Sequence, residues 1–153
     1  MADLRRRDPY SWRDDPGVPD FDDGGPIAVM DGSCAVCSWG ARTIARLDRA
    51  GAFRICPVNT PLGTALVRHH GVEPDDPETW LFLDEGCAWS EMEAILRIGE
   101  RLGGVGRLAT VMRVLPREAR KWLYRRIARN RYRFGQTDMC ALPDPALCAR
   151  LLR

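Results

Sequence analysis

Two cysteines separated by two residues, Cys34 and Cys37, have the clearest chemistry in this 153-residue sequence. They follow a short apolar run and the turn-forming residues Asp31-Gly32-Ser33, and helical spacing begins directly after them. We therefore expect Cys34 at the start of a helix, where free backbone N–H groups and the helix dipole stabilise a thiolate and hold its pKa below the usual value of about 8.5. Cys34 is then expected to attack a disulfide, and Cys37, one helical turn further on, to resolve the mixed disulfide.

Two neighbours of this pair are further candidates. Asp31 stands three residues before Cys34, at the end of the apolar run. A carboxylate this close to a dithiol can accept a proton from Cys37 or tune the thiol pKa through its charge. The alternative, that Asp31 only forms the turn into the helix, stays open. Trp39, directly after the motif, is a candidate for a substrate-binding surface.

A structural zinc site is the competing explanation for the cysteines. Such a site needs four ligands, usually in two close pairs. The other cysteines contain no second pair of this spacing; they are Cys56, Cys87, Cys140 and Cys148. His69 and His70 are adjacent rather than on one helix face, and we expect His69 partly buried and His70 solvated. No metal or organic cofactor is expected, with a zinc-stabilised domain as the alternative. Most of these cysteines fit buried packing positions, whereas Cys140 lies in an irregular, accessible segment.

The elements around the dithiol alternate between strand and helix. Strands are expected at 27–30, 53–58, 79–84 and 87–89, and helices after each of the first two and after the last. The order β-α-β-α-β-β-α is that of a thioredoxin-like domain of the α/β class, which we assign to residues 26–104. The first two strands are expected to be parallel, with a right-handed crossover. Ser90 and Glu93 predict a capping box at the last helix.

The flanking segments differ from this core. Residues 1–25 are rich in Asp, Arg, Pro and Gly and predict a flexible arm. Residues 105–153 show helical spacing throughout and predict a helical extension packed on the core. Trp122 and Ile127 are expected to face inward, and Asp144 to cap a last short helix.

The net charge of +2 is unevenly distributed. Residues 97–153 carry 14 basic and 4 acidic side chains, whereas residues 1–25 carry 4 Arg and 7 Asp. A basic segment on an acidic body is compatible with a non-catalytic module that binds an acidic protein or nucleic acid through its arginine-rich helices. A solvated helix face is the simpler interpretation, and no nucleic acid partner is expected.

Two segments of the chain, one at the dithiol and one in the C-terminal extension, resemble the DCC family of predicted thiol-disulfide oxidoreductases. Residues 31–37 match its aspartate, cysteine, cysteine signature, Pro116 and residues 124–135 resemble its second block, and Cys140 falls where members often carry a further cysteine. The resemblance implies a thioredoxin-like fold and dithiol-disulfide exchange with a protein or small-molecule substrate. Within the second block, Arg131 is a candidate to stabilise a thiolate if the helix end packs near the dithiol. The alternative is an ordinary helix C-terminus closed by Gly135.

Hydropathy predicts the cellular location. No stretch approaches the roughly 20 apolar residues needed to cross a bilayer, and the N-terminus has no hydrophobic run after its basic residues. We therefore expect a cytoplasmic protein without membrane contact.

Pro77 is the nearest candidate for the proline that faces the dithiol in thioredoxin-like domains.

Overall fold

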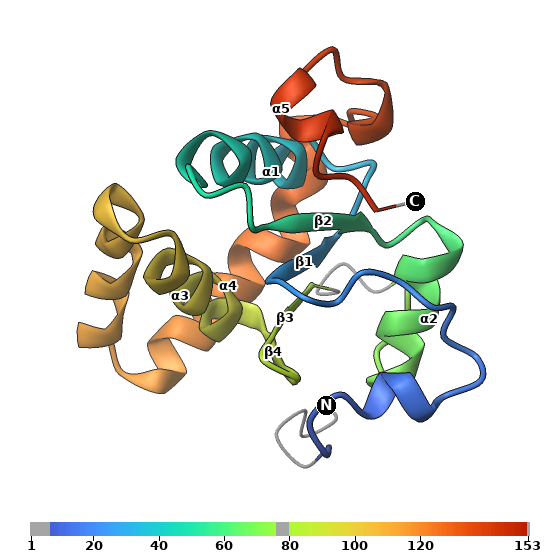
Figure 1. The fold of residues 1–153 in the computed structure, drawn as a ribbon. Helices are drawn as coiled ribbons and strands as arrows, with labels where there is room; N and C mark the ends of the chain where they lie inside the picture. Colours follow the sequence, from blue (N-terminus) through green and yellow to red (C-terminus); the bar gives the residue numbers. More distant parts are fainter. Residues whose placement is uncertain (1–6, 76–79, 153) are drawn as a thin grey trace.

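A four-stranded sheet forms the centre of the computed structural model, which describes residues 7–75 and 80–152. The strand order is β2-β1-β3-β4, with β1 (Ile27–Met30), β2 (Arg54–Pro57), β3 (Leu81–Asp84) and β4 (Cys87–Ser90). As expected, β1 and β2 are parallel, whereas β3 runs antiparallel to β1 and β4. Helices lie on both sides of this sheet (Figure 1). The thioredoxin-like α/β fold is confirmed; Pro77 lies outside the described residues.

The helices follow the predicted order, with local differences. The α-helices are α1 (Ala35–Leu47), α2 (Pro61–His69), α3 (Glu91–Leu102), α4 (Arg117–Asn130) and α5 (Pro145–Cys148), and the 3-10 helices are η2 (Ser11–Asp14), η3 (Gly104–Val114), η4 (Arg131–Phe134) and η5 (Met139–Ala141). The predicted capping box is wrong: Ser90 is the N-cap of α3, but its side chain makes no capping hydrogen bond. The chain turns directly from β4 into α3 at Glu91, whose φ of 54° is unusual for a residue with a side chain.

The strands alternate side chains between two cores. Ala28, Met30 and Phe82 pack with α1 and α3 on one face of the sheet, which we call the dithiol face. Val29 and Leu81 pack with α2 on the other, which we call the α2 face. Successive strand residues point to opposite sides, so both faces of this short sheet are apolar and both need covering.

The segment before β1 covers the α2 face, where the sequence predicted a flexible arm. Trp12 is only 3% exposed and belongs to the core on that side. Its Nε1–H donates to Asp23 at 2.9 Å, and the Tyr10 N–H donates to the carbonyl of Gly86 at 2.9 Å. A side chain at Gly86 would place its Cβ 2.6 Å from the Tyr10 ring. The buried apolar area of Trp12 stabilises the packing of this segment on the sheet, although the segment is mostly polar in composition.

His69 and His70 join the same segment to α2. The Ser11 hydroxyl lies 2.9 Å from His69 Nε2, and Asp15 Oδ2 lies 2.5 Å from His69 Nδ1. The prediction that His70 is solvated is wrong, since it is 1% exposed with Trp12 packed against its ring. The N-terminal segment covers it, and burial lowers the pKa of His70 to about 4.

The C-terminal extension packs on α3 in an unexpected orientation. Tyr124 and Ala128 form the buried positions of α4 and contact Met92 of α3. Trp122 and Ile127, predicted to face inward, are 66% and 46% exposed. A residue two positions from Tyr124 lies on nearly the opposite side of a helix, so burial of Tyr124 turns Trp122 outward.

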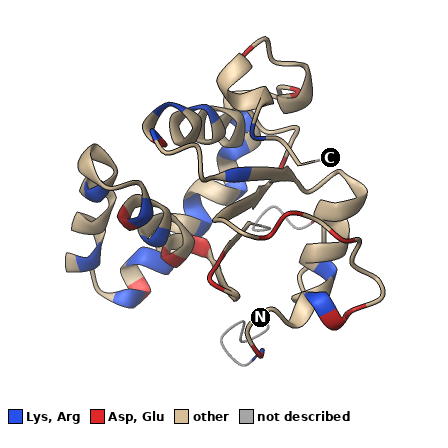
Figure 2. Ribbon diagram, viewed as in Figure 1, with Lys and Arg blue, Asp and Glu red and all other residues tan. Residues whose placement is uncertain are grey.

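Basic residues recur along α4, and acidic residues along the segment before β1 (Figure 2). Within α4, Arg120 lies 3.9 Å from Glu93 of α3, which ties part of this charge to the core. Asp144 caps α5 as predicted, because its Oδ1 accepts hydrogen bonds from two backbone N–H groups of that helix.

Candidate active site

The two cysteines of the motif lie at the N-terminus of α1. Cys34 is the N-cap residue, and its Sγ accepts a hydrogen bond from the Cys37 N–H at a distance of 3.4 Å. Both are free thiols. Cys34 Sγ therefore lies at the N-terminus of α1 with the Cys37 N–H directed at it, and a helix N-terminus is a position that favours negative charge.

The two thiols differ in their access to solvent. Cys34 is 0% exposed, whereas Cys37 is only partly buried. The cover over Cys34 comes from the C-terminal extension, where Gln136 forms a β-bridge with Cys34 and Gly135 accepts a hydrogen bond from the Ala35 N–H at 3.3 Å. Gly135 has a φ of 104°, a conformation that favours glycine and turns the chain back over the thiol.

Arg131 connects the dithiol to Asp31. Its Nη1 lies 3.3 Å from Cys37 Sγ, and its Nη2 lies 3.0 Å from Asp31 Oδ2. The Tyr132 hydroxyl donates to the same carboxylate oxygen at 2.5 Å, and Asp31 Oδ1 accepts from the Ser33 N–H. The structure thus brings the two predicted residues Asp31 and Arg131 together, with Arg131 in contact with the thiol and Asp31 in contact with Arg131.

Electrostatics separates the two sulfurs further. Burial, together with the neighbouring Cys34, raises the pKa of Cys37 to about 12. The charge of Arg131 and its hydrogen bond act in the opposite direction, toward a lower pKa. Burial also raises the pKa of the Tyr132 hydroxyl, as does its hydrogen bond to Asp31.

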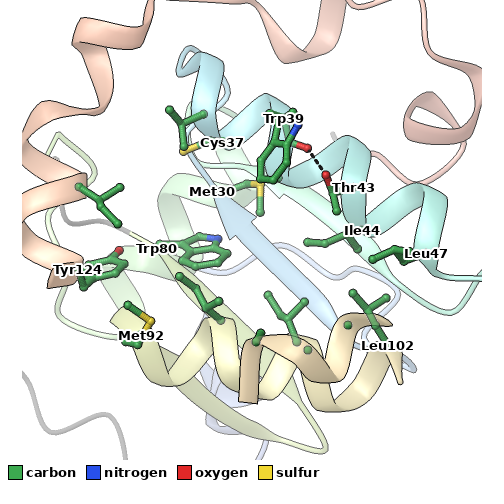
Figure 3. A pocket seen from close by; sticks show the side chains of 18 of the residues that line it. Met30, Cys37, Trp39, Thr43, Ile44, Leu47, Trp80, Met92, Leu102 and Tyr124 are labelled. Atoms are coloured by element: carbon green, nitrogen blue, oxygen red, sulfur yellow. Dashed lines mark hydrogen bonds between the residues drawn. The ribbon is translucent and has the colours of Figure 1, made fainter. Parts of the chain in front are cut away.

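An apolar pocket of about 520 Å³ opens beside Cys37, and the sequence did not predict it. Figure 3 shows Cys37 and Trp39 at one end, with Leu47 and Leu102 at the other. Trp39 is 65% exposed and lines the pocket, as does Arg131. The sequence contained one signal of this pocket, because the extension carries large apolar residues such as Leu108 and Ile127, which stay exposed and line it.

The remaining cysteines lie away from the pair in different environments. Cys140 is half-buried in η5, whose Met139 N–H donates to Gly32 O at 2.8 Å, just before the motif. Cys56 is buried as expected, and burial raises its pKa to about 11. Cys87 and Cys148 are exposed, against the prediction that they pack inside. Cys87 begins the edge strand at the hairpin turn, and Cys148 ends a one-turn helix, so neither backbone position is covered.

Among the described residues, no three His, Cys, Asp or Glu side chains gather as a metal site requires.

Comparison with known proteins gives this site a context. The family model of the DCC1-like thiol-disulfide oxidoreductases matches residues 28–137, a span that runs from β1 through the dithiol to the segment covering Cys34. The chain belongs to this family. The DCC1-like match thus includes Asp31, both cysteines and Arg131, and it ends before Cys140.

Two relatives in the family cover most of the chain. The uncharacterized protein YuxK of Bacillus subtilis (strain 168) is 27% identical over 127 residues, which is 82% of this chain and 93% of the relative. A protein of Arabidopsis thaliana named "DCC family protein At1g52590, chloroplastic" is 29% identical over 139 residues, which is 90% of this chain and 81% of the relative. No solved structure matches the chain. No helix among the described residues is long and apolar enough to span a bilayer.

Proposed function

We propose that this DCC1-like protein exchanges thiols and disulfides through Cys34 and Cys37, which alternate between two thiols and one disulfide. The contact of Cys34 Sγ with the Cys37 N–H at the start of α1 is the observation that carries the proposal. In the reducing direction, two protein thiols and one substrate disulfide yield the protein disulfide and two substrate thiols. Two electrons and two protons pass to the substrate, and no cofactor takes part.

Access decides which sulfur the substrate meets. The sequence predicted Cys34 as the attacking thiol, but it is fully buried beneath Gln136, whereas Cys37 is partly exposed. We therefore assign first contact to Cys37. A substrate thiolate attacks Cys37 Sγ of the protein disulfide, the bond between the two cysteines breaks, and Cys34 leaves as a thiolate. The N-terminus of α1 favours that charge, which makes Cys34 the better leaving group.

Arg131 and Asp31 support the charge that Cys37 takes up. In the reducing direction Cys37 must become a thiolate, and Arg131 Nη1 is its cationic partner at 3.3 Å. Asp31 holds Arg131 through Nη2 and is a positioning residue in this scheme, not the direct proton acceptor that the sequence suggested. Trp39 borders the approach to Cys37, and participation of Cys140 remains a prediction.

The test uses a variant with Cys87→Ser and Cys148→Ser, which removes the two exposed thiols outside the pair. Reduced protein is mixed with hydroxyethyl disulfide, and products are resolved by intact mass. The parent should form an internal Cys34–Cys37 disulfide without a lasting adduct. Adding Cys34→Ser should leave one stable adduct on Cys37, since no neighbouring thiol can displace it.

Two results would contradict the proposal. If the parent forms no disulfide between Cys34 and Cys37, the exchange activity itself is refuted. If Cys37→Ser carries an adduct on Cys34 as quickly as Cys34→Ser carries one on Cys37, exchange stands but the assignment of first contact to Cys37 is wrong.

A further inference from the structure

We infer that the apolar pocket beside Cys37 is the substrate site and that it selects a small thiol, or the corresponding disulfide, with an apolar body. This inference rests on the proposed exchange activity and names its substrate class. The pocket and the reacting sulfur are one continuous feature, because Cys37 itself lines the cavity (Figure 3).

The pocket has the size and lining of a small-molecule site. Its volume of about 520 Å³ falls within the range of roughly 300 to 1,000 Å³ that such sites occupy. Met30 of β1, Ile44 of α1, Ile98 of α3, Leu108 of η3 and Ile127 of α4 all line it, so elements from both the core and the extension surround the space. Because these elements border the space on several sides and leave it open at exposed residues such as Leu108, it can admit a compact molecule from solvent.

Small residues keep this space open. A Cβ added at Gly40, on the pocket side of α1, would have no other atom within 4 Å. Partly buried residues such as Trp80 and Leu102 pack against the core while also lining the opening.

Arg131 and the apolar lining define what the ligand carries. Arg131 lies at the Cys37 end, where the ligand sulfur must carry negative charge during exchange. The side chains along the rest of the pocket, such as Met30, Ile44 and Leu102, are apolar. The fitting ligand therefore has a thiol at one end and an apolar body.

One turnover from the oxidised pair balances as follows. The ligand thiolate attacks Cys37 Sγ, the bond from Cys37 to Cys34 breaks, and Cys34 takes the electron pair. A second ligand thiolate then attacks the ligand sulfur of the mixed disulfide. Cys37 leaves as a thiolate beside Arg131, and the Cys34 and Cys37 thiolates take up, through water, the two protons that the two ligand thiols released. Two ligand thiols are oxidised to one disulfide, and the protein disulfide is reduced to two thiols.

The test compares two alkyl thiols of similar acidity, phenylethanethiol and mercaptoethanol, as reductants of the oxidised protein. The phenyl ring can enter the pocket, whereas mercaptoethanol has no apolar body. We expect phenylethanethiol to react about 10- to 100-fold faster, the range that burial of a ring of this size supports. The rate constant is measured from the loss of the Cys34–Cys37 disulfide by mass spectrometry.

Gly40→Leu places a large apolar side chain in the pocket, and Arg46→Leu places the same side chain on an exposed position of α1 outside it. Gly40→Leu should reduce the ratio of the phenylethanethiol rate to the mercaptoethanol rate to less than about 3-fold, since the apolar body loses its site. Arg46→Leu should retain the full advantage. Thermal unfolding of both variants checks that each is folded, and leucine favours helix over glycine.

The outcomes separate the two proposals. If neither thiol reduces the disulfide, the proposed exchange activity fails. If both thiols react at the same rate, or Gly40→Leu has no selective effect, exchange stands and the pocket is not the substrate site. If a cysteine peptide with flanking leucines reacts faster than phenylethanethiol and is also impaired by Gly40→Leu, the pocket binds polypeptide and the assignment to small thiols is overturned.

Discussion

The apolar surfaces on the two faces of the sheet differ in how they are covered. On the α2 face, the chain's own N-terminal segment inserts Trp12, whose Nε1 pairs with Asp23, while buried His70 beside it has no hydrogen-bond partner on either ring nitrogen. On the dithiol face, an apolar space stays open beside Cys37, and Trp80 Nε1 has no partner. The chain covers the apolar surface of the α2 face with its own N-terminal segment, and it leaves an apolar surface open next to the Cys34–Cys37 pair.

This difference assigns separate tasks to the two faces. Changes on the α2 face should alter the free energy of unfolding and leave thiol exchange intact. Changes on the dithiol face should alter exchange and leave most of the stability intact. Variants that cross this division test whether it is real.

The largest effect is expected from Cys37→Ser, compared with Cys56→Ala on the α2 face. Loss of Cys37 removes the sulfur that meets the substrate, and reduction of hydroxyethyl disulfide should fall at least about 1,000-fold, as for other essential nucleophiles. Cys56 is a buried packing thiol, and Cys56→Ala should exchange at nearly the parent rate. Equal losses in both variants would show that the two faces are not functionally distinct.

Trp12→Ala should have the largest effect on stability. Removing a fully buried tryptophan typically costs about 3 to 5 kcal/mol, which urea unfolding measures directly. Exchange by the folded fraction should be unchanged, since Trp12 lies across the sheet from Cys37. Trp122→Ala is the matched control, because this side chain is 66% exposed and should change the unfolding free energy little. A loss below about 1 kcal/mol for Trp12→Ala would mean that the segment does not seal the α2 face.

His70 should make the stability of the α2 face depend on pH. Burial lowers its pKa from 6.5 to about 4, so the unfolded chain binds a proton more readily than the folded one. Above pH 6.5 His70 is neutral in both the folded and the unfolded chain, and the free energy of unfolding is at its full value. This free energy should fall by roughly 3 kcal/mol as the pH drops toward 4. His70→Leu should flatten this dependence in urea unfolding measured across that range. An unchanged slope in His70→Leu would place the pH dependence on another group.

Arg131→Gln should give the smallest of these effects, on exchange alone. Without the cation, the pKa of Cys37 should rise further, because the charge of Arg131 and its hydrogen bond both lower it. Reduction of hydroxyethyl disulfide at neutral pH should slow about 10- to 30-fold, as expected for loss of one charge-assisted contact. The rate should recover partly at higher pH, a change that a purely structural defect would not produce. Arg133→Gln, on an exposed neighbour, is the control.

Local patterns in the sequence predicted the position of the dithiol between a strand and a helix. They placed the pair at a helix start, because an apolar run and a turn come before Cys34 and helical spacing follows Cys37. In the structure Cys34 is the N-cap of α1. These features depend on residues a few positions apart. The family resemblance added Arg131, whose distance from Cys37 no local pattern indicates.

The packing of the flanking segments was not predictable in the same way. A single Trp12 outweighs the polar composition around it, and composition alone pointed to a flexible arm. The orientation of α4 depends on Tyr124 being buried against α3, and Trp122 was equally apolar. Burial is a property of the partner surface as well as of the residue, so a pattern within one helix cannot choose between them.

The sequence by itself determined the candidate pair, the order of strands and helices along the core and the position of Cys34 at the N-terminus of α1, since all three follow from local spacing and chain connectivity. Only the tertiary structure decided that Cys34 is covered, that Cys37 faces an apolar pocket and that the opposite face is sealed. Each of those outcomes depends on residues from distant parts of the chain, such as Gln136 over Cys34, meeting in space. Solvent access is set by such long-range contacts, which is why it had to come from the fold.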